Sequence, residues 1–127
     1  MANADIVREI YEFARRGNHR ELRTRISDDA TWQPAREDGW KACTSADEIV
    51  KTMLWRSSAN RLRPGDVLEL GGFVFVQLRG KRLERLGAKG FVPKLFQVIA
   101  LREGKVVSIH DYARRDEALA AVGVKPL

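Results

Sequence analysis

Residues that build metal centres and disulfides are scarce in this sequence. The 127 residues include one cysteine, Cys43, and two histidines, His19 and His110. A single cysteine cannot form an intramolecular disulfide, and a structural zinc site needs four cysteine or histidine ligands. We therefore expect no metal and no disulfide, and the cysteine usage agrees with a reducing compartment.

Long hydrophobic runs are also absent. No window approaches the roughly 18 consecutive apolar residues that a membrane-spanning helix needs. The opening residues, MANADIVREIYEF, lack the charged and then apolar layout of a signal peptide. The sequence therefore predicts a cytoplasmic protein with no membrane partner.

Acidic residues are outnumbered, with 23 lysines and arginines against 17 aspartates and glutamates and a formal net charge of +6. The excess could form a basic face for phosphate groups, or it could belong to a solvated surface that is rich in arginine. The basic residues are scattered and interleaved with acids, and no nucleic-acid-binding motif accompanies them. We favour a solvated surface and expect no nucleic-acid partner.

What the sequence does contain is the composition of one globular domain. Its hydrophobic fraction is 44% and its charged fraction is 31%, as in ordinary soluble proteins. A chain of this length usually forms a single core. We therefore expect one domain over residues 1–127.

Helical periodicity fills the first half of the chain, and strand periodicity fills the second. Apolar residues recur at helical spacing over 4–16, and Ser45 with Glu48 forms a capping box that opens a helix to about residue 58. The other expected elements are a short helix over 18–25, strands over 30–33, 67–70 and 73–78, a long connection over 79–92, a closing hairpin and a short C-terminal helix. This order predicts an α+β fold with helices packed on an antiparallel sheet.

The closing hairpin can be read in register. With Glu103 and Gly104 as the turn, the pairing that starts beside them continues outward until Phe96 opposes Asp111. One face then carries Phe96, Val98, Ala100, Val107, Ile109 and Asp111. Alternation sends His110 to the other face, opposite Gln97, which disfavours a His–Asp dyad. Asp111 is thus a single acid on an apolar face.

Three interpretations of Asp111 remain open. As a general base, it would lie in an apolar cup that raises the pKa of its carboxyl group. As a structural acid, it would pair with a buried arginine or accept hydrogen bonds from backbone or indole N–H groups. If the register is misread, it would face water. A closed apolar cavity without an arginine favours the base, whereas an ion pair favours the structural acid.

The order of the elements, the stretch Asp-Asp-Ala-Thr-Trp over 28–32 and the ending Gly-Lys-Val-Val-Ser-Ile-His-Asp-Tyr over 104–112 resemble the SnoaL-like branch of the nuclear transport factor two-like superfamily. Relatives in this superfamily include ketosteroid isomerases, limonene epoxide hydrolases and polyketide cyclases. The resemblance spans nearly the whole chain. It implies a cone-shaped, curved antiparallel sheet wrapped around the N-terminal helices, with an open-ended pocket. It also implies a homodimer that associates through the outer sheet face.

The catalytic residues of the epoxide hydrolases carry over only in part. In those relatives an Arg-x-Asp pair on the third strand works with the acid of a last-strand Asp-Tyr motif. The corresponding positions here are Leu78, Gly80 and Asp111, so one of the three is kept. The Tyr and Asn that hold the attacking water fall on Trp32 and Pro34. An indole offers a donor but no acceptor, and proline has no polar side chain.

The catalytic pair of the ketosteroid isomerases is also missing. A tyrosine on the first helix and an aspartate on the first strand fall here on Ile10 and Pro34, with Tyr11 one place out of register. Neither isomerisation of steroids nor hydrolysis of epoxides is therefore assigned.

We expect a pocket protein of the SnoaL-like type that takes a hydrophobic small molecule. As an enzyme it would be an acid–base isomerase, cyclase or hydrolase with Asp111 as the catalytic residue. It would need no cofactor, because a positioned carboxylate can transfer the proton alone. The alternative is a non-catalytic ligand-binding or dimerisation module with the same fold. The residues expected to line the pocket are Trp32, Val76, Leu78, Phe96, Val98 and Ile109.

Overall fold

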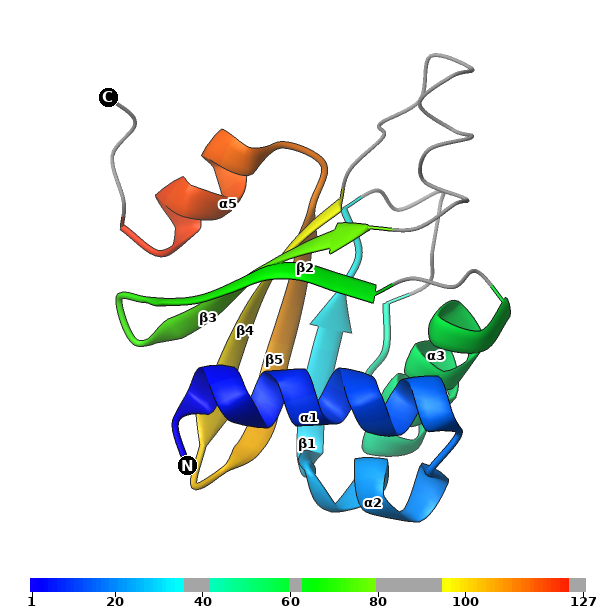
Figure 1. Cartoon of the computed structure of the whole chain (residues 1–127). Coiled ribbons are helices and arrows are strands. Elements are labelled where there is room, and N and C mark those ends of the chain that lie inside the picture. The colour runs from blue at the N-terminus through cyan, green and yellow to red at the C-terminus, as the bar shows by residue number, and fades with distance from the viewer. Residues whose placement is uncertain (36–41, 60–62, 80–94, 124–127) are drawn as a thin grey trace.

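The computed structural model describes residues 1–35, 42–59, 63–79 and 95–123 (Figure 1). In chain order the elements are α1 (Asn3–Arg16), α2 (His19–Thr24), β1 (Ile26–Gln33), α3 (Ala46–Ala59), β2 (Arg63–Leu70), β3 (Phe73–Arg79), β4 (Leu95–Arg102), β5 (Lys105–Tyr112) and α5 (Arg115–Ala121). The helices and strands predicted within these ranges are all present, although β1 and β2 each begin earlier than expected. Beyond Arg79, the connection predicted over 79–92 lies outside the described residues, and so does Trp40.

The five strands form one curved sheet in the order β1-β5-β4-β3-β2. Strands β2 to β5 pair antiparallel, whereas β1 runs parallel to β5. The predicted α+β cone is confirmed as a fold class, but the sheet is mixed and not purely antiparallel. Short hairpin turns force antiparallel pairing only between consecutive strands. Strands β1 and β5 are far apart in the chain, so no hairpin sets their relative direction.

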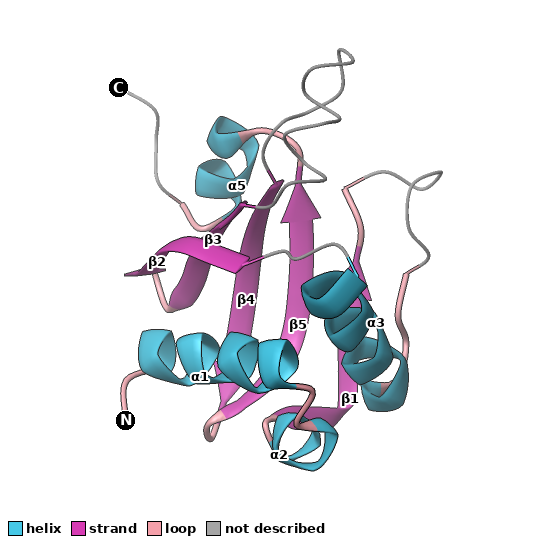
Figure 2. Ribbon diagram, turned by 45° about the vertical axis from the view of Figure 1, so that its right-hand side comes forward, coloured by secondary structure: helices cyan, strands magenta, loops and turns pink. Residues whose placement is uncertain are grey.

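The two faces of the sheet are covered by different helices. Helices α1, α2 and α3 pack on the concave face, and α5 lies on the opposite side (Figure 2). We call the side chains on the concave side the inner core, which includes Ile10, Leu22, Ile49, Val76, Ile99 and Ile109. The outer cluster, between the sheet and α5, consists of Phe75, Phe96, Val98, Ala118 and Val122.

Helix α1 ends where the sequence predicts. Gly17 adopts the left-handed conformation with φ 72°, and its N–H donates to the carbonyl of Ala14. At the other end of the helix, the backbone N–H of Ala4 donates to the carboxylate of Glu69 at 2.9 Å. The side chain of Arg8 donates to the carbonyl oxygen of Val67 at 3.1 Å. These contacts hold α1 along the edge strand β2.

The predicted cap of α3 is confirmed. The backbone N–H of Glu48 donates to Ser45 Oγ at 3.2 Å, and that hydroxyl donates to the Glu48 carboxylate at 3.2 Å. The cap fixes where the helix starts, and its periodicity then brings Met53, Arg56 and Ser57 to the interior, where all three are buried. None of the helices in the described ranges is long and apolar enough to cross a membrane.

The turn of the closing hairpin is also as predicted. Glu103 has φ 53° and Gly104 has φ 76°, as a two-residue turn of this kind requires, and Arg102 pairs with Lys105 beside it. The predicted register also holds for Leu101 and Val106, but it is wrong from Ala100 outward. The pairing shifts between Ala100 and Leu101, in the manner of a β-bulge. One inserted residue moves every later side chain of one strand relative to the other.

Candidate functional site

The register shift decides what surrounds Asp111. Asp111 pairs with Gln97 and not with Phe96, while Phe96 pairs with Tyr112 and Val98 with His110. Asp111 therefore shares the concave face with Gln97 and Ile109. Residues Phe96 and Val98, which we expected beside Asp111, lie on the opposite face. They pack in the outer cluster under α5, and their predicted place beside Asp111 is wrong because of the bulge.

Asp111 lies at the centre of a buried polar cluster that we define as Tyr11, Arg56, Gln97 and Asp111. Both terminal nitrogens of Arg56 donate to Asp111 Oδ2 at 3.2 Å. Gln97 Nε2 donates to Oδ1 at 2.9 Å, and the Tyr11 hydroxyl donates to Gln97 Oε1. The Asp111 side chain is 0% exposed and that of Arg56 is 4% exposed. Each oxygen of the carboxylate is thus occupied by a partner from another element.

Trp32 closes the polar cluster on the side of β1. The guanidinium carbon of Arg56 lies 4.5 Å from the centre of the indole ring, a cation–π arrangement. The indole N–H lies close enough to the carboxylate to lower the pKa of Asp111. Its Nε1 nevertheless makes no hydrogen bond of standard geometry to any described residue. The indole ring of Trp32 therefore packs against the Arg56 guanidinium, and its N–H is a buried donor without a standard hydrogen bond to the described residues.

Burial controls the protonation of both acidic groups in the polar cluster. Loss of hydration is the largest influence on Asp111 and raises the pKa of its carboxyl group, while Arg56 and the hydrogen bond from Gln97 oppose that rise. Burial also raises the pKa of the Tyr11 phenol well above its usual range, and the neighbouring carboxylate adds to the effect. The phenol therefore keeps its proton at any ordinary pH.

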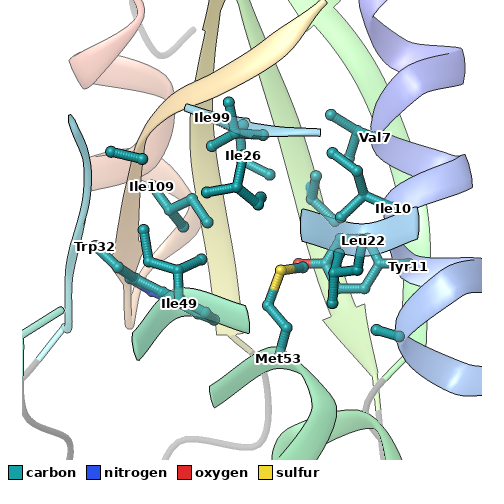
Figure 3. Packing of buried hydrophobic residues seen from close by; sticks show 14 of the residues in the cluster. Val7, Ile10, Tyr11, Leu22, Ile26, Trp32, Ile49, Met53, Ile99 and Ile109 are labelled. Carbon is teal, nitrogen blue, oxygen red and sulfur yellow. The ribbon is translucent and has the colours of Figure 1, made fainter. Parts of the chain in front are cut away.

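A cavity of about 10 Å³ adjoins the polar cluster. Its lining residues are Tyr11, Trp32, Met53, Arg56, Ser57, Leu78 and Gln97. A space of this size accommodates about one water molecule. In Figure 3, Trp32 and Tyr11 enter the core from opposite sides with Met53 between them. Asp111 does not line the cavity, whereas its partners Arg56 and Gln97 do.

The predicted pocket residues separate into three groups. Trp32 and Leu78 line the cavity. Val76 and Ile109 face the same side but are buried in the inner core, away from the cavity lining. The remaining two, Phe96 and Val98, lie on the outer face. His110 is exposed while Asp111 is buried, so the predicted separation of these neighbours onto opposite faces is confirmed.

Three members of the polar cluster were not predicted as partners of Asp111, although the sequence contains a signal for each. Arg56 follows Met53 by three positions on the apolar stripe of α3, where a charge is unexpected. Gln97 interrupts the apolar run Leu-Phe-Gln-Val-Ile-Ala of β4. Tyr11 follows Val7 by four positions, on the buried side of α1. Polar residues on apolar stripes therefore indicated partners for Asp111.

Cys43, the single cysteine, has a structural role. Cys43 is buried, and its backbone pairs with that of Trp32 in both directions at 2.9 Å. Its sulfur lies 3.4 Å from the hydroxyl of Thr52. This bridge supports the edge strand that carries Trp32. Among the described residues, no group of three or more His, Cys, Asp or Glu side chains is placed to hold a metal ion.

Solved structures share this fold. An NTF2-like protein of unknown function from Cytophaga hutchinsonii matches 88% of this chain and 89% of its own, with a TM-score of 0.64 and 13% identity. A de novo designed protein with a curved β-sheet matches 97% and 95%, with a TM-score of 0.65 and 15% identity. A Mycobacterium tuberculosis LEH-like epoxide hydrolase matches 87% and 80%, with a TM-score of 0.59 and 11% identity.

These likenesses establish the fold and no activity. No protein-family model matches the sequence, and no curated protein matches it significantly. The class that the fold defines is the nuclear transport factor two-like (NTF2-like) cone, as the sequence resemblance implied. A designed protein adopts it as well, so function must be argued from the side chains of this chain.

Proposed function

We propose that the protein is a cytoplasmic binder of a small hydrophobic molecule and that Asp111 positions Arg56 and Gln97 rather than acting as a general base. The observation that carries this proposal is the burial of Asp111, whose side chain is 0% exposed and whose two oxygens already accept hydrogen bonds. A general base must come within hydrogen-bond distance of the proton that it removes. Arg56 and Gln97 line the cavity, whereas Asp111 does not.

The polarity of the cavity supports a ligand that is mainly apolar with one polar end. Trp32, Met53 and Leu78 supply apolar surface, and Tyr11, Arg56, Ser57 and Gln97 supply polar atoms. Binding sites for small molecules generally combine an apolar lining with a few polar groups that orient the ligand. The cavity is small, so the polar end of a ligand would enter it first.

The second candidate is an acid–base isomerase, cyclase or hydrolase that uses Asp111. Burial raises the pKa of this carboxyl group, which is a property of many catalytic acids and bases. An LEH-like epoxide hydrolase among the structural neighbours adds a precedent for small-molecule chemistry on this fold. For this role, Gln97 or Arg56 would have to leave Asp111 during turnover.

A ligand screen on the wild type and on Asp111→Asn separates the two candidates. Compounds that raise the melting temperature are incubated with each protein and followed by NMR for chemical change. A binder leaves every compound unchanged, and Asp111→Asn weakens binding because Arg56 and Gln97 lose their anchor. A catalyst converts a bound compound, and the variant binds it without converting it. Conversion that depends on Asp111 would overturn the first candidate.

Association through the outer sheet face stays a prediction. Helix α5 packs over Phe75, Phe96 and Val98 on that face. Leu68 pairs with Phe75 and remains 45% exposed, which leaves apolar surface beside the outer cluster. Sedimentation velocity on the wild type and on Leu68→Lys tests it. A dimer that the variant dissociates supports this interface, and a wild-type monomer contradicts it.

A further inference from the structure

The direction of the hydrogen bonds in the polar cluster limits what the cavity can recognise. Gln97 donates from Nε2 to Asp111 Oδ1, so its other amide atom, Oε1, faces Tyr11. An amide oxygen only accepts, and the phenol must therefore donate its single hydrogen to it. Turning the amide over would place Oε1 against the carboxylate, where two acceptors repel. Asp111 thus fixes the direction of the Tyr11 hydroxyl through Gln97.

The direction of the Tyr11 hydroxyl determines which hydrogen bond this group can make at the cavity wall. Tyr11 lines the cavity, but its hydrogen is engaged by Gln97, so its oxygen can only accept a hydrogen bond there. Trp32 also lines the cavity, and an indole can only donate. Its Nε1 makes no hydrogen bond of standard geometry to a described residue, although the N–H lies close to the Asp111 carboxylate. The Ser57 hydroxyl also lines the cavity and can donate a hydrogen bond there. An acceptor and a donor therefore border the same small space.

A hydroxyl group satisfies both requirements, because it donates one hydrogen bond and accepts others. A carbonyl oxygen only accepts and would meet the Tyr11 oxygen without a hydrogen between them. The volume of about 10 Å³ matches one hydroxyl oxygen, or one water in its absence. Beside it, Met53 and Leu78 offer apolar contacts for the carbon that bears the hydroxyl, and the unbranched Met53 can move to make room.

We propose that this cavity recognises the hydroxyl group of an apolar small molecule, an alcohol or phenol on a hydrocarbon skeleton, and that Gln97 is the positioning residue that sets this preference. The proposal rests on the ligand-binding function above and deepens it. It also opposes a role for Tyr11 as a donor to a substrate carbonyl, because the hydrogen that such a role needs is held by Gln97.

The test compares matched alcohols and ketones. Cyclohexanol with cyclohexanone, and indan-1-ol with indan-1-one, are titrated into ¹⁵N-labelled wild-type protein, and dissociation constants come from the chemical-shift changes. One additional hydrogen bond corresponds to roughly fivefold tighter binding, so we expect the alcohols to bind about fivefold tighter than the ketones. Ketone preference, or equal binding, would overturn the inference.

Three variants identify the source of the preference. Gln97→Met releases the Tyr11 hydrogen into the cavity, so the ketones gain affinity and the alcohol preference is lost or reversed. Tyr11→Phe removes the acceptor, so the alcohols lose about fivefold while the ketones do not. This variant keeps the aromatic ring and carries the test if Gln97→Met fails to fold. The matched control is Gln33→Met, at an exposed position of β1, which should keep the wild-type preference.

A spectroscopic readout reports the hydroxyl direction without any ligand. The chain has two tyrosines, so Tyr112→Phe leaves Tyr11 alone for ultraviolet resonance Raman spectroscopy. The tyrosine doublet distinguishes a phenol that donates from one that accepts. We expect a donor signature in Tyr112→Phe and its loss when Gln97→Met is added. An acceptor signature in Tyr112→Phe would contradict the assigned direction.

The outcomes separate this inference from the function on which it rests. Binding of both probe classes without discrimination overturns the hydroxyl preference and leaves ligand binding intact. If neither class binds, the proposed function fails and the recognition fails with it, even where the donor signature is found. Alcohol preference that persists in Tyr11→Phe shows that another group makes the contact, and this too overturns the proposal.

Discussion

The two sides of the sheet are stabilised by different kinds of interaction. On the concave side, a network of directional polar contacts joins α1, α3, β4 and β5 through Tyr11, Arg56, Gln97 and Asp111. On the outer side, a short helix is held by apolar contact, with Phe75 and Phe96 stacked at 5.9 Å between ring centres. The inner polar cluster depends on which atom faces which, whereas the outer cluster depends on filled volume.

This contrast shows which substitutions each side should tolerate. Apolar packing accepts replacements of similar volume, because dispersion and burial have little directional preference. A buried ion pair accepts few replacements, because the remaining partner is left charged in a poorly hydrated site. Substitutions in the polar cluster should therefore be tolerated less well than conservative substitutions in the outer cluster.

The largest effect is expected from removing the cation alone. Arg56→Met leaves the Asp111 carboxylate buried without its counterion, which should lower the free energy of unfolding by about 3–5 kcal/mol at neutral pH. Arg56→Lys should recover little of it, because an ammonium group cannot reproduce the two contacts of the guanidinium. Urea denaturation followed by circular dichroism measures both.

The double variant Arg56→Met with Asp111→Leu is the control for this loss. Replacing a buried ion pair by apolar residues of similar volume is often nearly neutral for stability. We therefore expect the double variant to be more stable than Arg56→Met alone. A double variant that is as unstable as the single one would mean that the ion pair itself, and not the orphaned charge, supplies the stability.

Truncation in the outer cluster should cost somewhat less. Phe75 is fully buried and also lies under the guanidinium of Arg115, 5.4 Å from its ring centre. Phe75→Ala should destabilise the protein by about 3 kcal/mol, through lost burial and the cavity left behind. Phe75→Leu should cost below about 1.5 kcal/mol. Urea denaturation measures both losses. If Phe75→Leu loses as much stability as Phe75→Ala, the outer cluster tolerates a conservative replacement no better than the polar cluster tolerates Arg56→Lys, and the proposed contrast fails.

A smaller effect is expected where α5 meets the β2–β3 turn. Gly71 has φ 57°, and a side chain there would bring its Cβ to 2.6 Å from the carbonyl oxygen of Val122. Gly72 also has a positive φ, 84°, but has nothing within 4 Å of such a Cβ. Gly71→Ala should therefore cost about 2 kcal/mol, and Gly72→Ala about 1 kcal/mol from backbone strain alone.

Hydrogen exchange locates that loss. If the close approach to Val122 matters, Gly71→Ala should accelerate exchange of the α5 amides more than Gly72→Ala does. The inner helices should be unaffected in both, because they pack on the other face. Equal exchange rates of α5 in the two variants would show that the helix is not held at this point.

The smallest and most diagnostic difference lies in the pH dependence. Burial raises the pKa of Asp111 above its ordinary value of 3.8. The stability linked to this group is therefore fully present below pH 3.8 and is lost as the pH rises through the folded-state pKa. The contribution of the exposed Asp28 to stability has the opposite dependence on pH. Its contact with Arg23 lowers its pKa, so its contribution is present above pH 3.8 and is lost on acidification.

Urea denaturation at a series of pH values checks these signs. Relative to Asp111→Asn, the wild type should lose stability as the pH rises from about 4. Relative to Asp28→Asn, it should lose stability as the pH falls below about 4. If the wild type instead becomes more stable relative to Asp111→Asn as the pH rises, the ion pair with Arg56 outweighs the lost hydration of the carboxylate.

Local sequence signals predicted most of the fold because their causes are local. The glycine at the end of α1, the serine cap of α3 and the Glu103-Gly104 turn each act within a few residues. The parallel pairing of β1 with β5 had no such signal, since the strands that meet are about eighty positions apart. The early start of β1 at Ile26 was also missed, because Asp28 and Asp29 are exposed on an edge strand, where charge is tolerated.

The candidate site was less accessible to prediction. The sequence singled out Asp111 as the one acid among the apolar residues of the closing hairpin, placed His110 on the opposite face, and assigned Trp32 to the interior or the pocket wall. Only the tertiary structure decided its partners, because one bulge between Ala100 and Leu101 exchanged Phe96 for Gln97 beside it. The packing of α3 then brought Arg56 to the carboxylate from 55 residues away. Alternation along a strand is a local property, whereas the choice of side chains that meet across strands and helices is settled by packing of the whole core.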